Sequence, residues 1–412
     1  MLVLISMFSF DTKIGEDIIY MDSVTLSSAD YMTHLYIVGQ TGTGKSTLIE
    51  NAFQDVIKWR AGGLFIDPHG DSFETILNTI PKERTNDVVL IDLLDTENPV
   101  AFNPIANVPR GKISRVTADI VSTLAHVMNL SLEATPRIYT YLENTIYALT
   151  EAKGYSLGDI PKFLEDDQFR KLVLNRVTHS GVLEFWAQYN KLSTSKKLER
   201  TESTLTRLRS LMLHPCMENI LAQRRNKINI RAIIDEQKLV IVNLAKGQVG
   251  DNIARLFGGM LIHAVFLAGL SRIDTPPHLR RPFYVFADEF PIYGIGSGTL
   301  KETLSEIRKY KIGVVLGNQY TGQVTDDVMS AIIGNVGSIV AFRVGADDAE
   351  KLHEKLECSV KTLMNLSNHR ARLNVLQNGD VANSYTVQTY PPVRIYYGNA
   401  DKIRKRSRER YA

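Results

Sequence analysis

Short apolar runs recur along the chain, and most of them end at a polar residue or a turn. Continuous uncharged runs of this length are typical of strands that helices cover on both faces of a parallel sheet. Stretches with helical periodicity separate most of the runs. They predict an α/β fold with an open, mostly parallel sheet flanked by helices, whose ligand lies beyond the carboxyl ends of the strands. The predicted strands cover residues 35–38, 63–66, 88–91, 239–242, 283–286, 313–316 and 338–341.

Between about residue 110 and residue 227 the strand-like runs stop, and the apolar residues recur with a period of 3.6. This change predicts an all-α domain, residues 110–227, inserted between an N-terminal part of the core, residues 1–109, and a C-terminal part, residues 228–395. A basic tail, residues 396–412, follows. Three helical faces carry the pattern: Ile113, Val116, Ile120, Leu124 and Val127; Ile138, Leu142 and Leu149; and Leu198, Leu205, Leu208 and Met212.

The first predicted strand leads into a phosphate-binding pattern, in which glycine, four residues and Gly-Lys-Ser occupy the required places. Small residues let successive backbone N–H groups surround phosphates. Lys45 then brings a charge to the β- and γ-phosphate oxygens, and Ser46 offers a hydroxyl to Mg²⁺. A strand before the loop and an amphipathic helix after it disfavour a chance match, so we predict a site for ATP and Mg²⁺. The loop reads Gly39-Gln40-Thr41-Gly42-Thr43-Gly44-Lys45-Ser46-Thr47, and Leu48, Ile49, Ala52, Phe53, Val56 and Ile57 share the face of the helix.

Polar residues at the ends of two later strands predict the rest of the site. The apolar run 283–287 ends in Asp288-Glu289, as in a Walker B strand. Asp288 would hold Mg²⁺ opposite Ser46, and Glu289 would act as general base toward water; a solvated turn is the alternative. Gln319 closes the next strand and would sense the γ-phosphate or orient water, with a polar strand cap as the alternative. Arg308, on the preceding helix, is by pattern alone a surface arginine.

Composition adds a few limits. The 412 residues, 44% hydrophobic and 23% charged, are ordinary for a globular protein of two or three domains. Two distant cysteines, Cys216 and Cys358, indicate a reducing compartment without disulfides. The net charge of +3 and the basic clusters favour solvated faces, with nucleic-acid contacts as the alternative. Glycines within residues 291–301 predict a flexible connection, with a mobile channel-facing loop as the alternative.

Neither apolar stretch of the chain is long enough to predict a membrane span. Residues 256–271 carry no formal charge, but they are fewer than the roughly 18 residues of a span, so we predict a buried core helix. The apolar start, residues 1–10, is too short for an anchor and lacks a cleavage site. We therefore expect a cytoplasmic protein.

Taken together, these motifs resemble the HerA/FtsK superfamily of ring-forming P-loop ATPases, in particular the TraD/TraG-like coupling proteins of conjugation and type IV secretion. The resemblance covers roughly residues 31–392. Besides the P-loop it rests on Phe65-Ile66-Asp67-Pro68-His69-Gly70-Asp71, Phe102-Asn103-Pro104, Val242-Asn243-Leu244-Ala245-Lys246-Gly247, Asp288-Glu289-Phe290, Glu306-Ile307-Arg308-Lys309-Tyr310, Asn318-Gln319-Tyr320, Gly334-Asn335-Val336-Gly337 and Phe342-Arg343-Val344-Gly345.

The resemblance implies a RecA-like motor domain in a homo-hexameric ring, with DNA in the central channel. It also implies that Arg308 reaches the γ-phosphate of the neighbouring subunit. His69 would then be structural or adjacent to the nucleotide. Coupling proteins commonly carry N-terminal membrane helices, and HerA proteins an N-terminal β-barrel. Only 34 residues precede the first predicted strand here, so we expect neither, and expect membrane association only through a relaxase, secretion-channel or effector partner.

Three functions are compatible with these features. The first is an ATP-driven DNA translocase that hydrolyses Mg-ATP at the subunit interfaces of a ring. The second is an ATP-gated ring scaffold that recruits or regulates an effector protein and translocates little DNA. The third, a small-molecule kinase, is disfavoured because the insertion is long and broadly helical, where such an enzyme needs an acceptor pocket and an arginine-rich lid.

Overall fold

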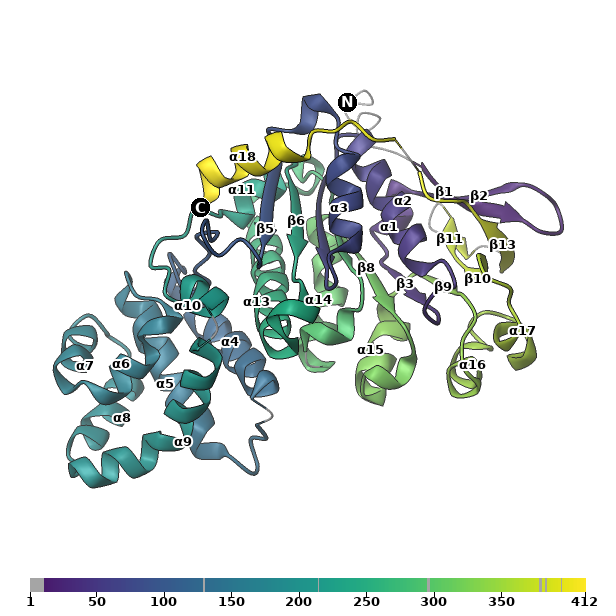
Figure 1. Cartoon of the computed structure of the whole chain (residues 1–412). Helices are drawn as coiled ribbons and strands as arrows, with labels where there is room; N and C mark the ends of the chain where they lie inside the picture. The colour runs from purple at the N-terminus through teal and green to yellow at the C-terminus, as the bar shows by residue number, and fades with distance from the viewer. Residues whose placement is uncertain are drawn as a thin grey trace. The chain divides into compact units, whose positions relative to one another are not determined.

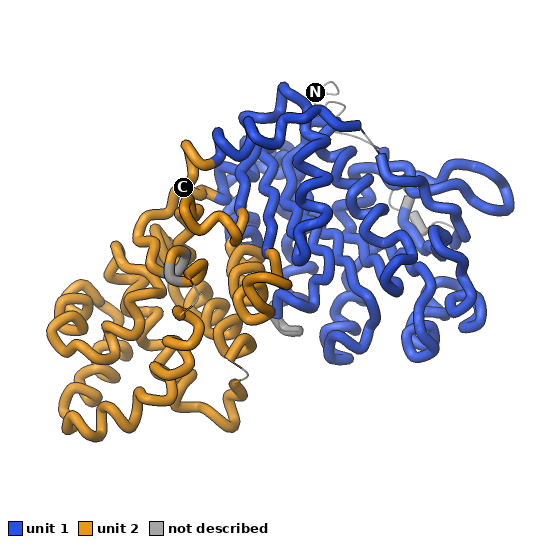
Figure 2. The backbone as a smooth tube through the Cα atoms, viewed as in Figure 1, with its two compact units in different colours: residues 1–91, 230–244, 265–407 blue, residues 92–229, 245–264, 408–412 orange. Residues whose placement is uncertain are grey.

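The computed structural model describes residues 11–412 apart from positions 129, 214, 295–296, 378–379, 382–383 and 394. The chain divides into two compact units (Figure 2). Unit 1 comprises Met1–Ile91, Ile230–Leu244 and Val265–Ser407, and unit 2 comprises Asp92–Asn229, Ala245–Ala264 and Arg408–Ala412.

The helical unit begins earlier than our predicted insertion, at Asp92. The segment that follows Asp92 is tied to distant parts of unit 2. The N–H of Ala101 donates to the carbonyl of Tyr411, and the carbonyl of Ala101 accepts the N–H of Lys227. These bonds explain why the compact unit includes this segment, while the domain boundaries at residues 109 and 227 stay a prediction.

The described residues of unit 1 form an eleven-stranded sheet in the order β2-β1-β13-β10-β9-β3-β8-β7-β4-β6-β5 (Figure 1). The pairs from β9 through β3, β8, β7 and β4 to β6 are parallel. The open, mostly parallel sheet flanked by helices is therefore confirmed. The strands are β1 (Asp11–Asp17), β2 (Ser23–Ser27), β3 (Leu35–Val38), β4 (Gly62–Asp67), β5 (Val88–Asp92), β6 (Leu239–Asn243), β7 (Phe283–Ala287), β8 (Ile312–Asn318), β9 (Ser338–Ala341), β10 (Arg370–Asn374) and β13 (Tyr385–Thr389), and β11 (Leu376–Gln377) pairs with β12 (Asp380–Val381) apart from them.

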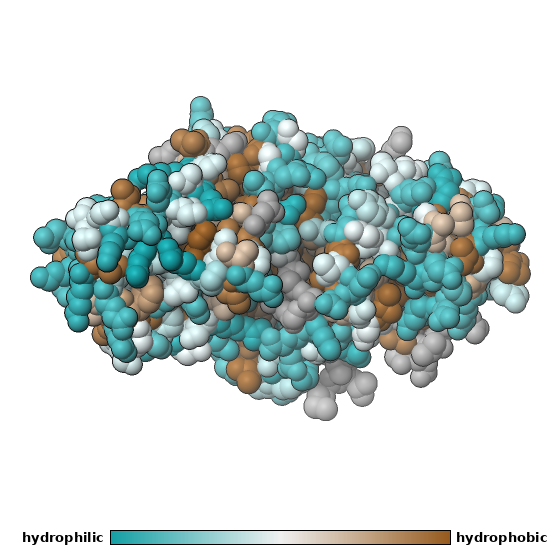
Figure 3. Space-filling view, turned by 90° about the horizontal axis from the view of Figure 1, so that it is seen from below, coloured by the Kyte–Doolittle hydropathy of each residue, from teal (hydrophilic) through white to brown (hydrophobic). Residues whose placement is uncertain are grey.

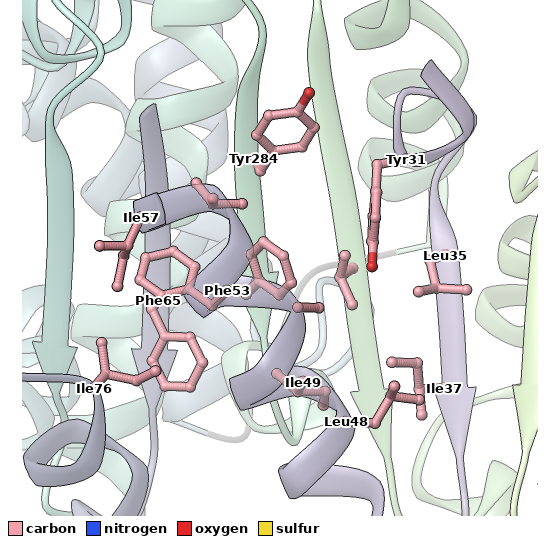
Figure 4. Close-up of a cluster of buried hydrophobic side chains, with 14 of the residues drawn as sticks. Tyr31, Leu35, Ile37, Leu48, Ile49, Phe53, Ile57, Phe65, Ile76 and Tyr284 are labelled. Carbon is pink, nitrogen blue, oxygen red and sulfur yellow. The ribbon is translucent and has the colours of Figure 1, made fainter. Parts of the chain in front are cut away.

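The parallel strands are apolar because both of their faces are covered. Every residue is buried in six of the strands: β3, β4, β6, β7, β8 and β9. On one face, Phe53 of α2 (Lys45–Lys58) packs against Phe65 of β4 (Figure 4). Its ring centroid lies 5.0 Å from that of Phe65 and 5.3 Å from that of Phe286 of β7. The helix that follows the phosphate-binding loop is thus anchored to the middle of the sheet.

We did not predict the four antiparallel strands at one edge of the sheet, β2, β1, β13 and β10. We expected the first strand at residue 35, which was wrong, because β1 and β2 precede it. β1, β13 and β10 extend the sheet beyond β9 through antiparallel pairs. Buried and exposed residues alternate along much of β1 and β2, so these strands contain no continuous apolar run.

The remaining helices of unit 1 flank this sheet. The predicted connection at residues 291–301 is largely helical, with a 3₁₀ turn (Phe290–Tyr293) before α14, and its positions 295–296 lie outside the described residues. The helices are α1 (Ser28–Tyr31), α3 (Asp71–Asn78), α11 (Ile230–Asp235), α14 (Ser297–Ile307), α15 (Asp326–Asn335), α16 (Ala346–Leu352) and α17 (Val360–Met364), while α13 (Asp251–Leu270) and α18 (Ala400–Tyr411) have residues in both units.

Unit 2 is built from helices among its described residues. Its core includes Trp186, which contacts the rings of Tyr141, Phe163 and Tyr189 edge-on. Leu198, predicted on the apolar face of its helix, is 58% exposed, and no residue in the first two turns of that helix, residues 194–200, is buried. The helices are α4 (Ile113–Val127), α5 (Pro136–Ala152), α6 (Ile160–Glu165), α7 (Asp167–Leu174), α8 (Ser180–Asn190), α9 (Thr194–Met212), α10 (Pro215–Leu221) and α12 (Lys246–Val249).

Among the described residues, one helical stretch, Asp251–Asp274, is long and apolar enough to cross a membrane. Its most apolar window is 72% buried inside the protein, as expected of a core helix. Residues 1–10, which we expected to be too short for an anchor, lie outside the described part of the chain. Both cysteines are free thiols, as predicted.

The basic tail is a helix, which the charge pattern did not reveal. Within unit 1, Ile403 of α18 is fully buried, and the hydroxyl of Ser407 accepts the N–H of Leu90 at 2.8 Å. Arg404 forms an ion pair with Glu74 of α3. Part of the tail's charge therefore serves packing within the unit.

Candidate active site

The phosphate-binding loop connects β3 to α2 at the carboxyl end of β3. Gly44, the residue before the helix, has a φ of 114°, a conformation that residues with a side chain rarely adopt. A Cβ at Gly44 would also lie 3.0 Å from Nδ1 of His369. The local backbone therefore has the form that the sequence pattern predicts, with the helix starting at Lys45.

The structure brings Lys45, Ser46 and Asp288 together. Nζ of Lys45 lies 2.8 Å from Oδ1 of Asp288, and the hydroxyl of Ser46 donates to Oδ2 at 2.9 Å. The order β3-β8-β7 explains this meeting, because only β8 separates the two strands whose ends carry these residues. Gly317 of β8 makes room for it, since a Cβ there would lie 2.4 Å from Oδ1 of Asp288.

Glu289 is held from two sides. Its Oε2 lies 3.1 Å from Nε2 of His69, and its Oε1 accepts a hydrogen bond from the amide nitrogen of Gln319. The side chain is 9% exposed, and the backbone has a positive φ of 46°, uncommon for a residue other than glycine. The ends of β4, β7 and β8 therefore each contribute one of these three residues.

The turn after β4 is organised by Asp67. Its carboxylate accepts the N–H of His69 at 2.8 Å and that of Phe73 at 2.7 Å. Burial raises the pKa of Asp67 above its ordinary value, and the hydrogen bonds from backbone N–H groups oppose that shift. The turn is thus braced by a buried carboxylate next to the candidate site.

The oxygen donors fit Mg²⁺. This ion usually takes one or two protein ligands and completes its shell with phosphate oxygens and water. The hydroxyl of Ser46 and the carboxylate of Asp288 lie next to each other in space, as such a site requires. Among the residues that the structure describes, no group of three or more His, Cys, Asp or Glu side chains forms an alternative metal site.

Sequence comparison identifies the family. The family model described as "Helicase HerA, central domain" matches residues 14–265, more than half of the chain. The chain belongs to this family. It is therefore a P-loop ATPase of the HerA/FtsK type. No curated protein matches the sequence.

The fold of this HerA-family ATPase is similar to that of solved structures of a coupling protein. The bacterial conjugative coupling protein TrwB, lacking its first 70 residues, is 16% identical, with a TM-score of 0.65 over 90% of this chain and 87% of the other. TrwB with ADP and Mg²⁺ gives 0.64 at 16% identity, over 90% and 88% of the two chains. TrwB with a non-hydrolysable ATP analogue gives 0.63 at 16% identity, over 89% and 87%. These similarities show the RecA-like fold.

Arg308 lies away from the P-loop of its own chain. It directly follows α14, in an exposed 3₁₀ turn (Arg308–Tyr310) before β8. The whole of β8, seven residues or about 20 Å, separates it from Gln319 at the carboxyl end. Arg308 therefore lies at the opposite end of β8 from the strand end that carries Gln319.

His369 and Arg343, to which no role was assigned from the sequence, contact the P-loop. The N–H of His369 donates to the carbonyl of Thr43 at 2.8 Å, and the N–H of Gln40 donates to the carbonyl of Arg343 at 3.0 Å. The guanidinium of Arg343 also reaches the side chain of Gln40, at 3.4 Å. Gln40 and Arg343 lie 303 positions apart, so only the order of the strands could have revealed the pairing.

A cavity of about 1060 Å³ opens beside the P-loop within unit 1. Residues of the P-loop, of the segment after β8 and of α16 line it, and the helix contributes three acidic side chains. In the view from below, the surface is mostly hydrophilic with scattered hydrophobic residues (Figure 3). The lining residues include Gln40, Thr41, Gln319, Asp347, Asp348 and Glu350.

Proposed function

We propose that this HerA-family ATPase is a DNA translocase of the conjugative coupling type, which hydrolyses Mg-ATP at the subunit interfaces of a homo-hexameric ring. The observation that carries the proposal is the convergence of Lys45, Ser46, Asp288, Glu289 and Gln319 at one edge of the sheet. Similarity along about 90% of the chain to a bacterial conjugative coupling protein supports the DNA substrate.

Each residue has a proposed role in hydrolysis. The N–H groups of residues 39–47 and the ammonium of Lys45 bind the phosphates. Ser46 and Asp288 would hold Mg²⁺, which when bound would neutralise charge on the phosphate oxygens. Glu289 takes the proton of the attacking water, and Gln319 orients that water or senses the γ-phosphate.

The position of Arg308 supports the proposal of a ring. Because it lies at the opposite end of β8 from its own P-loop, we assign it to the triphosphate of the neighbouring subunit. A trans-acting arginine stabilises charge in the transition state and contributes about 10³ to 10⁵ in rate. DNA would pass through the centre of the ring, contacted mainly at its phosphates. We place the protein in the cytoplasm, with relaxase, secretion-channel or effector proteins as partners that would bring it to a membrane.

The test is the ATPase rate with and without DNA over a range of salt concentrations. Phosphate contacts make binding insensitive to sequence and strongly dependent on salt. We expect DNA to raise the rate severalfold at low salt and the stimulation to fall steeply as salt increases. The Lys45→Ala variant, which we expect to lack hydrolysis, gives the background rate of phosphate release in the assay. Equal rates with and without DNA, in every oligomeric state, would contradict translocation.

The ATP-gated scaffold has its own supporting observation. Two basic residues that could contact DNA are paired within unit 2: Lys197 with Asp167 and Arg224 with Asp159, each at 2.8 Å. In this second function the partner protein, not DNA, would raise turnover. A Glu289→Gln variant that binds ATP should still assemble with the partner, which co-purification in the presence of ATP would show.

A further inference from the structure

The contact between His69 and Glu289 joins two segments that the sequence places far apart. Glu289 uses one carboxylate oxygen for each of two neighbours, Oε1 for Gln319 and Oε2 for His69. We propose that His69 is a positioning residue for ATP hydrolysis, which fixes the orientation of the Glu289 carboxylate toward the attacking water. The inference rests on the proposed role of Glu289 as general base.

The backbone of His69 is held firmly although its side chain is 51% exposed. Its N–H is bonded to Asp67, which is 4% exposed, and the same carboxylate accepts the N–H of Phe73, whose side chain is fully buried. The next residue, Gly70, has a φ of 100°. Two anchored neighbours and a left-handed residue define the turn, and the imidazole extends from it to Glu289.

Glu289 needs such support because its own backbone is strained. With φ at 46° and ψ at 44°, it occupies the left-handed region that glutamate rarely adopts. A carboxylate can rotate about its last side-chain bond, and a single hydrogen bond from Gln319 leaves that rotation partly free. The contact of Nε2 of His69 with Oε2, at 3.1 Å, restrains the second oxygen as well.

The pairing leaves the carboxylate able to act. Each carboxylate oxygen has two lone pairs, so the hydrogen bond from Gln319 and the contact with His69 still leave sites for the proton of a water molecule. Proton transfer requires close alignment, and an error of about 1 Å in position can cost a hundredfold in rate. Removing His69 should therefore lower turnover and leave nucleotide affinity largely unchanged.

The first experiment compares His69→Ala and His69→Gln with wild type and with His278→Ala, an exposed histidine in a different turn. We measure kcat, KM, ATP affinity and melting temperature. We expect His69→Ala to lower kcat about tenfold to a hundredfold with ATP affinity unchanged. His69→Gln, whose amide nitrogen can donate to the same oxygen, should recover most of the rate. His278→Ala should match wild type.

Two outcomes would overturn the proposal. If His69→Ala keeps the wild-type kcat, the contact does not position the base. If His69→Ala and His69→Gln lose the same activity, or the loss lies in ATP affinity, His69 acts as a nucleotide contact or a structural residue instead.

A double mutant separates this inference from the role of Glu289. Glu289→Gln should lower kcat sharply, and adding His69→Ala to it should cause no further loss, because the group being positioned is gone. A Glu289→Gln variant with wild-type kcat would defeat the proposed role of Glu289. A fully additive double mutant, with Glu289→Gln impaired, would defeat only the positioning role of His69.

Discussion

Lys45 and Asp288, 243 positions apart in the chain, form an ion pair with 2.8 Å between Nζ and Oδ1. The two side chains are 6% and 13% exposed, so both charges are largely buried. Each charge is balanced by the other, which offsets the cost of removing them from water. The pair joins the phosphate-binding loop to the acidic strand end, and Ser46 binds the other oxygen of the same carboxylate. These three residues of the candidate site are therefore brought together within a single chain.

Lys45→Ala is expected to abolish ATP hydrolysis and weaken ATP binding, because the phosphate oxygens lose their positive partner and Asp288 loses its own. A fall of at least a hundredfold in kcat/KM, measured by phosphate release, is the expected result. Lys58→Ala provides the control, since this exposed lysine ends the same helix. Residual activity close to wild type in Lys45→Ala would place the phosphates elsewhere.

Glu289→Gln should bind ATP with nearly normal affinity and hydrolyse it about 10² to 10⁴ times more slowly, since general-base catalysis contributes that range. The amide keeps the size of the side chain and loses the basic oxygen. Single-turnover hydrolysis and binding of a fluorescent ATP analogue measure the two quantities separately. Equal losses in binding and turnover would assign Glu289 to the fold of the site.

Arg308→Ala should retain ATP binding and lose about 10³-fold or more in turnover, if the arginine serves a neighbouring subunit. Mixing provides a sharp test. A ring containing both Arg308→Ala and Lys45→Ala subunits has some interfaces with an intact P-loop facing an intact Arg308. Activity of the mixture above that of either variant alone is expected, and its absence would exclude a trans role.

Gly317→Ala should impair hydrolysis by displacing the carboxylate of Asp288. Its added Cβ would lie 2.4 Å from Oδ1 of Asp288 and 2.9 Å from Cδ1 of Ile49, so the carboxylate must move. We expect a loss of at least tenfold in kcat. Gly334→Ala is the matched control, because a Cβ there meets nothing within 4 Å and alanine favours its helix by up to about 1 kcal/mol.

His34 should make stability depend on pH. Burial lowers its pKa from 6.5 to about 4, and its ring bridges the carbonyl of Leu304 and the N–H of Val314. The unfolded chain therefore binds the proton more readily between these values, and the free energy of unfolding falls as the pH drops from 6.5 to 4. The loss from this group is about 3 kcal/mol at most.

Urea unfolding at several pH values, in wild type and in His34→Asn, measures this effect. Asparagine tolerates the left-handed backbone of this position, where φ is 67°, and it does not titrate. The variant should be less stable at pH 7 and should lose less stability on acidification. Parallel pH curves for the two proteins would show that His34 is not the titrating group.

Secondary structure was predictable where it is encoded locally. The loop at residues 39–47 and the uncharged runs of the parallel strands are contiguous patterns, and each expected strand lies where the structure has one. β1 and β2 were missed because one of their faces is polar. The tail helix α18 was hidden by its charge, although Ile403 and Ser407 are buried.

The sequence alone determined the phosphate-binding loop, the parallel strands and the acidic strand end, because each depends on neighbours in the chain. Only the tertiary structure decided which of these elements meet. The order β3-β8-β7-β4 places Asp288 at Lys45, Gly317 between their strands, and His69 at Glu289. Strand order is set by packing between segments hundreds of residues apart, and no local pattern records it.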